Sequence, residues 1–417
     1  MTTALLYDSI SRNTGDIAIG IAGEQALAER GIASRTLDPF VETAEAPLLI
    51  GGGELIRDAG DDFYDRYRRP GSHILNAAGV WTSATDLDYL RAYHYVSARS
   101  EVEVEHLRTW APDARLLPCT TTLLRSEHYE IPGLEAGEPV VGIHMVPHSL
   151  RLIDDLVERV NAIPHKKVFI PFTHYNADAS FMRSLPFRWE NTIVLDNLKP
   201  LELHSVIGQM SYVVVSSLHA SIFAYSQGVG FGSIHQTKTA NYFRDRGLDD
   251  FMIKDSASFV SIVDQLENGG FDGSKQLDAD RQAVNTAYDE YARILGGAEL
   301  ESRPARTTSA ARQQRASVLL AQADRVVADR DLAIAMVERR RDLANAMAER
   351  QREQSERVEA EVQDQLRRVT DEYSAFRRRR WVRAGESAGR ILRGVRARLL
   401  RVLQRARGDR GGVGHID

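Results

Sequence analysis

The chain is 417 residues long, 43% of them hydrophobic, with a net charge of −5 at neutral pH. Its length indicates more than one structural unit, and its apolar content suffices for buried cores. No segment approaches the roughly 18 uninterrupted apolar residues of a membrane-spanning helix, and the amino terminus lacks the basic region and apolar run of a signal peptide. The single cysteine, Cys119, cannot form an internal disulfide. We therefore expect a cytoplasmic protein without membrane spans or disulfides.

Residues 1–125 alternate short apolar runs with helical stretches. After the first run, the turn Asn13-Thr14-Gly15-Asp16 leads into a predicted helix over residues 17–30. Short apolar strands that alternate with helices are typical of a parallel sheet covered on both faces. We therefore predict an N-terminal Rossmann-like domain over residues 1–125. Its strands are expected at residues 4–7, 47–50, 72–76 and 93–97.

A second α/β series follows a predicted linker. Residues 126–139 are polar and contain proline and glycine, which favours a connection between domains. Residues 140–295 are predicted to form a C-terminal Rossmann-like domain, with strands at residues 140–143, 168–171, 192–196 and 212–216. Two such units in tandem predict a glycosyltransferase-B-like architecture. In this architecture ligands bind in a cleft at the carboxyl ends of the parallel strands.

The next segment is predicted to be a long helix. Residues 296–309 form a second predicted linker, and residues 310–376 lack glycine and proline, which favours one continuous helix. Its apolar residues step by four and three at Val362, Leu366, Val369, Tyr373 and Phe376, although Arg330, Arg341 and Asn345 interrupt the seam upstream. We predict a coiled coil that makes the protein a homo-oligomer. The alternative is a solvated single helix, or one that packs on the body.

Residues 377–417 are predicted to form a basic amphipathic tail. Between residues 377 and 410 there are 13 arginines against Glu386 and Asp409, a balance of 13 − 2 = +11. The rest of the chain must then carry −5 − 11 = −16. Such a tail favours peripheral binding to an anionic membrane surface. A tail that is disordered or bound to a protein partner remains open, whereas nucleic acid is disfavoured because Trp381 is nearly the only aromatic residue available for stacking.

His219 is the main candidate for chemistry. It follows the predicted strand that ends at Ser216, near the start of a helix, where an imidazole can face a ligand cleft. The other histidines, His144, His148 and His174, are scattered and have no cysteine near them, so we expect no metal site. Taken alone, a single histidine at such a place is more often a structural group.

A nearby acidic cluster is interpreted as structural. Glu101, Glu103 and Glu105 follow one another at alternate positions. On a helix this spacing brings the outer two residues to a common face, where like charges repel modestly. We therefore interpret the cluster as the solvent-exposed beginning of a helix.

Six short segments, taken in order, resemble the polysaccharide pyruvyltransferase family over about residues 5–255. Each is weakly specific, but together they are moderately specific. They are the turn Asn13-Thr14-Gly15-Asp16, the strand end Gly51-Gly52-Gly53-Glu54-Leu55-Ile56, the element Val96-Ser97-Ala98-Arg99-Ser100-Glu101, Leu195-Asp196 with Lys199-Pro200-Leu201-Glu202-Leu203, Leu218-His219-Ala220 with Ile222-Phe223-Ala224, and Lys238 with Phe243 and Leu248.

The resemblance implies transfer of an enolpyruvyl-derived group from phosphoenolpyruvate to two sugar hydroxyls, which forms a pyruvate ketal in a cell-surface or exopolysaccharide precursor. Phosphoenolpyruvate is then the donor substrate, and no cofactor is implied. His219 would be the catalytic acid/base, and Arg99, Lys238 and Ser217 would bind the donor. Residues implied to line the cleft are Asn13, Gly15, Asp16, Gly51, Gly52 and Gly53. The three glycines are equally compatible with a tight strand-to-helix turn. The tail would bring the enzyme to lipid-linked saccharides on the inner face of the cell membrane.

The chain also departs from the family pattern. Ser217 stands where the family has an arginine before Leu-His, and Pro118-Cys119-Thr120-Thr121 replaces an Asp-Pro element. Either another cation compensates, with Arg125, Arg151 and Arg183 as candidates, or the donor differs, or the chain is not catalytic. Two alternative functions therefore stay open: a sugar-nucleotide-dependent glycosyltransferase, or an assembly protein that acts through its coiled coil.

Overall fold

The computed structural model of the protein describes residues 2–11, 13–40, 42–44, 47–61, 63–135, 137–172, 178–196, 198–296, 302–304, 309–378 and 392–401. The chain forms two compact units, Met1–Ala335 and Met336–Asp417, and each is described by itself.

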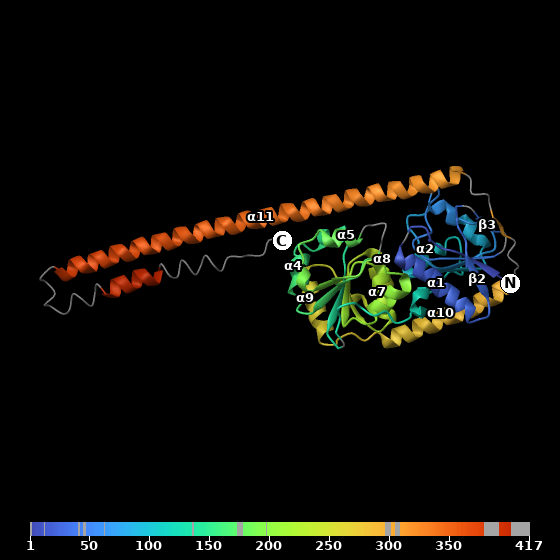
Figure 1. The fold of residues 1–417 in the computed structure, drawn as a ribbon, viewed down its shortest axis with the longest axis horizontal. Coiled ribbons are helices and arrows are strands. Elements are labelled where there is room, and N and C mark those ends of the chain that lie inside the picture. Colours follow the sequence, from blue (N-terminus) through green and yellow to red (C-terminus); the bar gives the residue numbers. More distant parts are fainter. Residues whose placement is uncertain are drawn as a thin grey trace. The chain divides into compact units, whose positions relative to one another are not determined.

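The first of two six-stranded sheets belongs to the amino-terminal part of the first unit (Figure 1). Its strands are all parallel and follow the order β2-β1-β4-β5-β6-β7. Every residue of β4 and β5 is buried, as expected for a sheet covered on both faces. The elements are β1 (Thr2–Leu6), α1 (Thr14–Ala28), β2 (Ala33–Thr36), β4 (Leu48–Gly51), β5 (Ile74–Ala78), β6 (Tyr95–Ala98), α2 (Glu101–Leu107) and β7 (Arg115–Leu116).

The second sheet is also parallel and follows the order β10-β9-β8-β11-β12-β13. The two parallel sheets confirm the prediction of two Rossmann-like units. The strands are β8 (Val140–His144), β9 (Lys166–Phe169), β10 (Thr192–Val194), β11 (Tyr212–Val215), β12 (Gly230–Ile234) and β13 (Met252–Ile253). The helices are α3 (Pro147–Leu152), α4 (Leu156–Ala162), α5 (Asp178–Arg183), α6 (Pro200–Ile207), α7 (Leu218–Ser226), α8 (Thr237–Arg244) and α9 (Ser256–Glu267).

Each sheet has a point at which the chain changes its direction of travel across the sheet. In the first sheet this switch lies between β1 and β4, and in the second it lies between β8 and β11. The loops after such neighbouring strands diverge to opposite faces and leave a crevice at the carboxyl edge. The residues after these four strands are therefore the ones that the topology places at a ligand site.

The last helix of the predicted second domain contributes to the core of the first. α10 (Ser274–Leu295) buries Tyr288 and Tyr291 in one apolar cluster with Leu5, Leu49 and Ile74 of the first sheet. The predicted linker over residues 296–309 also contains a strand, β14 (Ser302–Pro304), which pairs antiparallel with β3 (Glu42–Ala44). The chain thus returns to the first sheet after it has completed the second.

α11 (Ser309–Arg378) is one continuous helix, as the sequence predicts. Its residues 341–375 are exposed or half-buried. Pairing into a coiled coil stays a prediction. Residues 392–401 of the tail are helical, and the rest of residues 379–417 lies outside the described residues. None of the described helices combines the length and the apolar character needed to cross a membrane.

Candidate functional site

A pocket of about 290 Å³ lies where the two switch points face each other. The first sheet contributes residues that follow β1 and β4, and the second contributes His144 at the end of β8 and Ser216 after β11. Topology therefore explains why segments far apart in the sequence meet here. The lining residues used below are Asp8, Asn13, Asp16, Gly53, Glu54, Arg57, Tyr64, Arg99, His144, His148, Arg151, Ser217, His219, Lys238 and Asp329.

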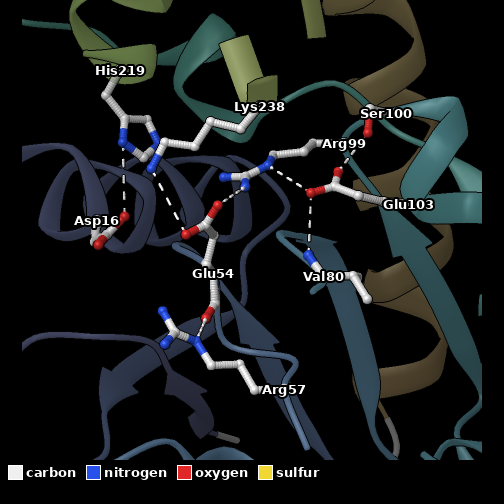
Figure 2. Close-up of polar contacts among 9 residues, drawn as sticks. All are labelled: Asp16, Glu54, Arg57, Val80, Arg99, Ser100, Glu103, His219 and Lys238. Carbon is white, nitrogen blue, oxygen red and sulfur yellow. Dashed lines mark hydrogen bonds and ion pairs between the residues drawn. The ribbon is translucent and has the colours of Figure 1, made fainter. Parts of the chain in front are cut away.

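His219 and Asp16 both line the pocket, and their side chains point toward each other (Figure 2). His219 stands in the first turn of α7, and Asp16 stands in the first turn of α1, whose N-cap Asn13 accepts a hydrogen bond from the Gly15 amide. Nδ1 of His219 lies 3.7 Å from Oδ1 of Asp16. A Cβ atom on Gly15 would lie 2.2 Å from the same Nδ1. Glycine at position 15 is therefore what lets the imidazole approach helix α1.

Burial sets the protonation of this pair. Burial, together with the nearby Asp8 carboxylate, raises the pKa of Asp16 to about 8, although Lys238 and Arg99 oppose the shift. Burial, together with the positive charges of Arg99 and Lys238, lowers the pKa of His219 to about 3. At pH 7 Asp16 is thus a neutral acid and His219 a neutral base. One proton donor and one proton acceptor stand side by side.

Arg99, at the end of β6, is held by two carboxylates. Its Nε lies 3.2 Å from Oε1 of Glu103, and its Nη2 lies 3.2 Å from Oε1 of Glu54. Arg99 is only 5% exposed, and a Cβ atom on Gly79 would lie 2.4 Å from its Nη2. The guanidinium is therefore fixed in position by ion pairs and by close packing.

Glu54 links Arg99 to the second domain. Its Oε2 lies 3.8 Å from Nζ of Lys238, whose side chain on α8 is 40% exposed (Figure 2). Burial raises the pKa of Glu54, but Lys238, Arg99 and Arg57 outweigh burial and lower it below its usual value. Glu54 is thus a carboxylate at neutral pH. It holds Arg99 and Lys238, the two cations that the sequence predicted as donor ligands, on one side of the pocket.

The interpretation of Glu103 as a solvent-exposed residue is wrong. Glu103 is 6% exposed, and it accepts hydrogen bonds from the Ser100 hydroxyl at 2.8 Å and from the Val80 amide at 3.1 Å. Its bond to Arg99 completes this buried network. The neighbours Glu101 and Glu105 are exposed as expected. Arg99 precedes helix α2 and Glu103 lies in its first turn, so the bend of the chain at Ser100 brings the two side chains together.

Ser217 lines the pocket as the N-cap residue of α7, and its side chain makes no capping hydrogen bond. Of the three cations considered as its replacement, Arg151 lines the pocket, 4.0 Å from Asp329 of α11. Arg125 pairs instead with Glu29, and Arg183 pairs with Asp196; none of these four residues lines the pocket. Sequence reasoning missed a further cation, Arg57, which follows the glycine-rich turn and also lines the pocket.

The three glycines after β4 have different positions. Gly52 and Gly53 have φ angles of +93° and +68°, in the left-handed region that favours glycine. Gly53 lines the pocket, and a Cβ atom there would lie 3.0 Å from Oδ2 of Asp16. Gly51 packs against Asn76, and Gly52 packs against Ile19 and Tyr7. The turn thus brings the backbone close to Asp16, and Gly53 is the member that faces the cleft.

Two histidines considered as metal ligands have other partners. Nε2 of His144 lies 2.8 Å from Oδ2 of Asp178, and Nε2 of His148 lies 3.1 Å from the carbonyl oxygen of His235. Both rings line the pocket, which the sequence did not predict. His174 lies outside the described residues. Among the residues that the structure describes, no three His, Cys, Asp or Glu side chains come together as metal ligands.

Comparison with solved structures gives low similarity. The putative UDP-N-acetylglucosamine 2-epimerase of Listeria monocytogenes is 11% identical, with a TM-score of 0.48 over 73% of this chain and 98% of that one. The lipopolysaccharide outer core galactosyltransferase WaaB is 11% identical, with a TM-score of 0.39 over 71% and 99%. The glycosyltransferase SsfS6 of Streptomyces sp. SF2575 is 12% identical, with a TM-score of 0.38 over 72% and 100%.

Comparison of sequences is more specific. No curated protein matches the chain. The family described as polysaccharide pyruvyl transferase matches residues 13–234, which is more than half of the chain. The match begins at Asn13 and includes Asp16, Arg99 and His219. The chain therefore belongs to the polysaccharide pyruvyl transferase family.

Proposed function

We propose that the pocket transfers a pyruvyl group from phosphoenolpyruvate to two hydroxyls of a sugar in a cell-surface or exopolysaccharide precursor. The product is a pyruvate ketal. The observation that carries this proposal is that Asp16 and His219 lie 3.7 Å apart in one pocket that several cations also line. Membership of a transferase family supports it.

The cations suit a donor that carries a carboxylate and a phosphate. Arg57, Arg99, Arg151 and Lys238 all line the pocket. A charge-assisted hydrogen bond contributes roughly 1.5–3 kcal/mol, so two or three of them provide substantial donor affinity. Arg99 is already held by Glu54 and Glu103 and needs little reorganisation when the donor binds. In this proposal Arg151 supplies the charge that Ser217 lacks.

The first half of the reaction needs a proton donor and a proton acceptor. Asp16 gives its proton to the methylene carbon of the enol, which becomes a methyl group. The neighbouring carbon becomes electrophilic, and the first sugar hydroxyl attacks it as His219 accepts the hydroxyl proton. General acid and base groups act best when their protonated and free forms are populated at the working pH. The pKa of Asp16, about 8, lies close to pH 7, and the lowered pKa of His219 leaves its ring unprotonated and able to accept a proton.

The second half closes the ketal. The carbon–oxygen bond to phosphate breaks, and phosphate leaves with the bonding electrons toward the cations. The second sugar hydroxyl attacks the same carbon and loses its proton. One of the two hydroxyl protons restores Asp16, and the other leaves with phosphate, so atoms and charges balance. His219 thus acts as the base and Asp16 as the acid, a division of the acid/base role that the sequence assigned to His219 alone.

Thermal denaturation of the full chain tests the donor. Phosphoenolpyruvate should raise the melting temperature, and Lys238→Ala should reduce that shift. Lys238 is suitable because its side chain is 40% exposed and its removal leaves the buried network intact. A shift with UDP or GDP, and none with phosphoenolpyruvate, would favour the sugar-nucleotide-dependent glycosyltransferase. No shift with any of them would favour the non-catalytic assembly protein.

The partners follow from the carboxyl-terminal segments. We propose that α11 pairs with a second copy and that residues 377–410 bind an anionic membrane surface on its cytoplasmic side. Such binding would bring the pocket to a lipid-linked acceptor. The full chain should then sediment with vesicles that contain anionic lipid and stay in the supernatant with neutral vesicles. Equal sedimentation with both would remove this part of the proposal.

A further inference from the structure

An exposed tryptophan stands next to the pocket in the first domain. Trp81 is 45% exposed, and it follows Val80, whose amide bonds to Glu103 of the buried network. Around it Thr82, Ser83, Thr85 and Asp86 are exposed and polar. An indole among polar neighbours does not form the broad apolar patch of a protein interface. The side chain is thus better suited to a small ligand with both polar and apolar surface.

The ring of Trp81 is held in one orientation. The guanidinium carbon of Arg57 lies 3.9 Å from the centroid of the Trp81 ring and 3.5 Å from that of Tyr64. Nε of Arg57 donates to the backbone carbonyl of Glu54 at 3.2 Å, and a side-chain hydrogen bond joins Trp81 to the Glu54 carboxylate. The indole is therefore connected to the same carboxylate that holds Arg99 and Lys238.

The position of Trp81 and the rigidity of its ring together indicate a role in ligand binding. Arg57 and Tyr64 line the pocket, and Trp81 extends the same stack beyond them. A rigid aromatic ring offers a large contact area at little entropic cost, and its electron-rich face attracts polarised C–H groups. Pyranose rings present such C–H groups on one face and hydroxyls around the rim. Glu54, beside Trp81, offers an acceptor for those hydroxyls.

We propose that Trp81 is a saccharide-binding residue that stacks against a sugar ring of the acceptor and directs its diol toward Asp16 and His219. This subsite rests on the proposed function, because it gives the sugar side of the same pocket. Phosphoenolpyruvate would bind among the cations, and the sugar would bind over the Trp81 ring. Trp81 thus sets acceptor affinity without taking part in proton transfer.

The test compares saccharide binding with donor binding in the full chain. The probes are the methyl pyranosides of galactose, glucose, mannose and N-acetylmannosamine, titrated by saturation-transfer NMR. At least one should bind the unmodified chain, and Trp81→Ala should weaken that binding about tenfold. Trp81→Phe, which keeps an aromatic face, should weaken it less. Trp189→Phe is the matched control, because Trp189 is 38% exposed but lies beside Phe169 and Phe187 in the second domain.

The outcomes separate this subsite from the proposed function. If no pyranoside binds, or if Trp81→Ala binds as well as the Trp189→Phe control, the subsite is refuted. Thermal stabilisation by phosphoenolpyruvate should be unchanged in Trp81→Phe, which keeps an aromatic ring beside Arg57, and in Trp189→Phe. If phosphoenolpyruvate stabilises none of the variants while Trp81-dependent pyranoside binding persists, the subsite stands and the donor assignment fails.

Discussion

Nδ1 of His219 lies 3.7 Å from Oδ1 of Asp16, so a helix of each Rossmann-like domain contributes one member of this pair of titratable side chains. The pair exists only because the two switch points face each other across the pocket. Its two pKa shifts have opposite signs, and burial is the largest cause of both. The stability of the fold should therefore depend on pH in a way that can be assigned to these two residues.

Asp16→Asn should reduce the loss of folding stability that the unmodified chain shows as the pH rises. The folded pKa of Asp16, about 8, is above the value of 3.8 expected in the unfolded chain. Its contribution to stability is therefore fully present below about pH 4 and is lost as the pH rises through about 8. In urea unfolding at pH 5, 7 and 9, the unmodified chain should lose more stability across this series than Asp16→Asn. Parallel losses in both proteins would contradict the raised pKa.

Gly15→Ala should destabilise the fold through His219. The added methyl would lie 2.2 Å from Nδ1 of His219, and overpacking of this kind costs about 1–3 kcal/mol. The added methyl would also lie 2.5 Å from Cβ of His219, so His219→Gly, which removes both the ring and Cβ, should recover most of the loss in the double variant. Gly20→Ala is the control, since its methyl would meet Tyr7 instead and His219→Gly should not relieve it. Additive effects in the first double-mutant cycle would contradict the close contact.

Glu103→Gln should lower the free energy of unfolding much more than its position in a charged helix suggests. The substitution leaves the guanidinium of Arg99, which is 5% exposed, with a single remaining carboxylate. Breaking a buried pair typically costs about 3–5 kcal/mol in the free energy of unfolding. Glu105→Gln on the same helix removes an exposed charge and should change stability by about 0.5 kcal/mol or less. Equal effects in chemical denaturation would mean that Glu103 is not buried in solution.

Sequence patterns predicted this site in part, because they report strand ends well. Apolar runs located β1, β4, β8 and β11, and the residues after them line the pocket. The patterns missed β2, whose Ala-Ser-Arg-Thr sequence is polar because it is an edge strand, and β12, in which two glycines weaken the strand signal. They also missed the place of Arg57 in the pocket and the burial of Glu103, which depends on the packing of α2 as well as on its partners Ser100, Arg99 and Val80.

The packing of α10 shows a second kind of information that sequence patterns do not contain. Its apolar face is readable in the sequence, but periodicity does not say which of two sheets that face will cover. Tyr288 reaches Asn76 of the first domain, with 3.2 Å between Oη and Nδ2, although the two residues are 212 positions apart. A contact of this range is set by the complete fold, and so local patterns place α10 with the domain that precedes it.

Arg151→Ala should weaken phosphoenolpyruvate binding if Arg151 compensates for Ser217. Loss of one charge-assisted contact corresponds to about a tenfold weaker dissociation constant in calorimetry. Ser217→Arg, introduced into the same variant, restores an arginine at the family position and should recover part of the affinity. Arg183→Ala is the control, because Arg183 pairs with Asp196 and neither lines the pocket. If Arg151→Ala and Arg183→Ala bind the donor equally well, Arg151 has no role in the site.

Leu343→Asp combined with Met347→Asp should turn an oligomer into a monomer. Leu343 and Met347 are 63% and 59% exposed on α11, and a 70-residue helix with such residues in water is stabilised when they pack against a partner. The pattern Asp-Leu-Ala-x-Ala-Met-x-Glu-Arg-x-Arg at 331–341 recurs at 342–352, an interval of 342 − 331 = 11 residues. That period explains why Arg341 and Asn345 interrupt a heptad, since an 11-residue repeat places other positions on the seam.

Analytical ultracentrifugation of the full chain measures this effect directly. The unmodified protein should sediment as a dimer or a higher oligomer, and the double variant should sediment as a monomer, because two carboxylates would enter an apolar seam. Arg350→Asp also introduces a carboxylate on this helix, but at a polar position of the repeat, and it should leave the oligomer intact. A monomeric unmodified chain would show that α11 forms no coiled coil and is a solvated single helix or one that packs on the body, and the mass would not change in any variant.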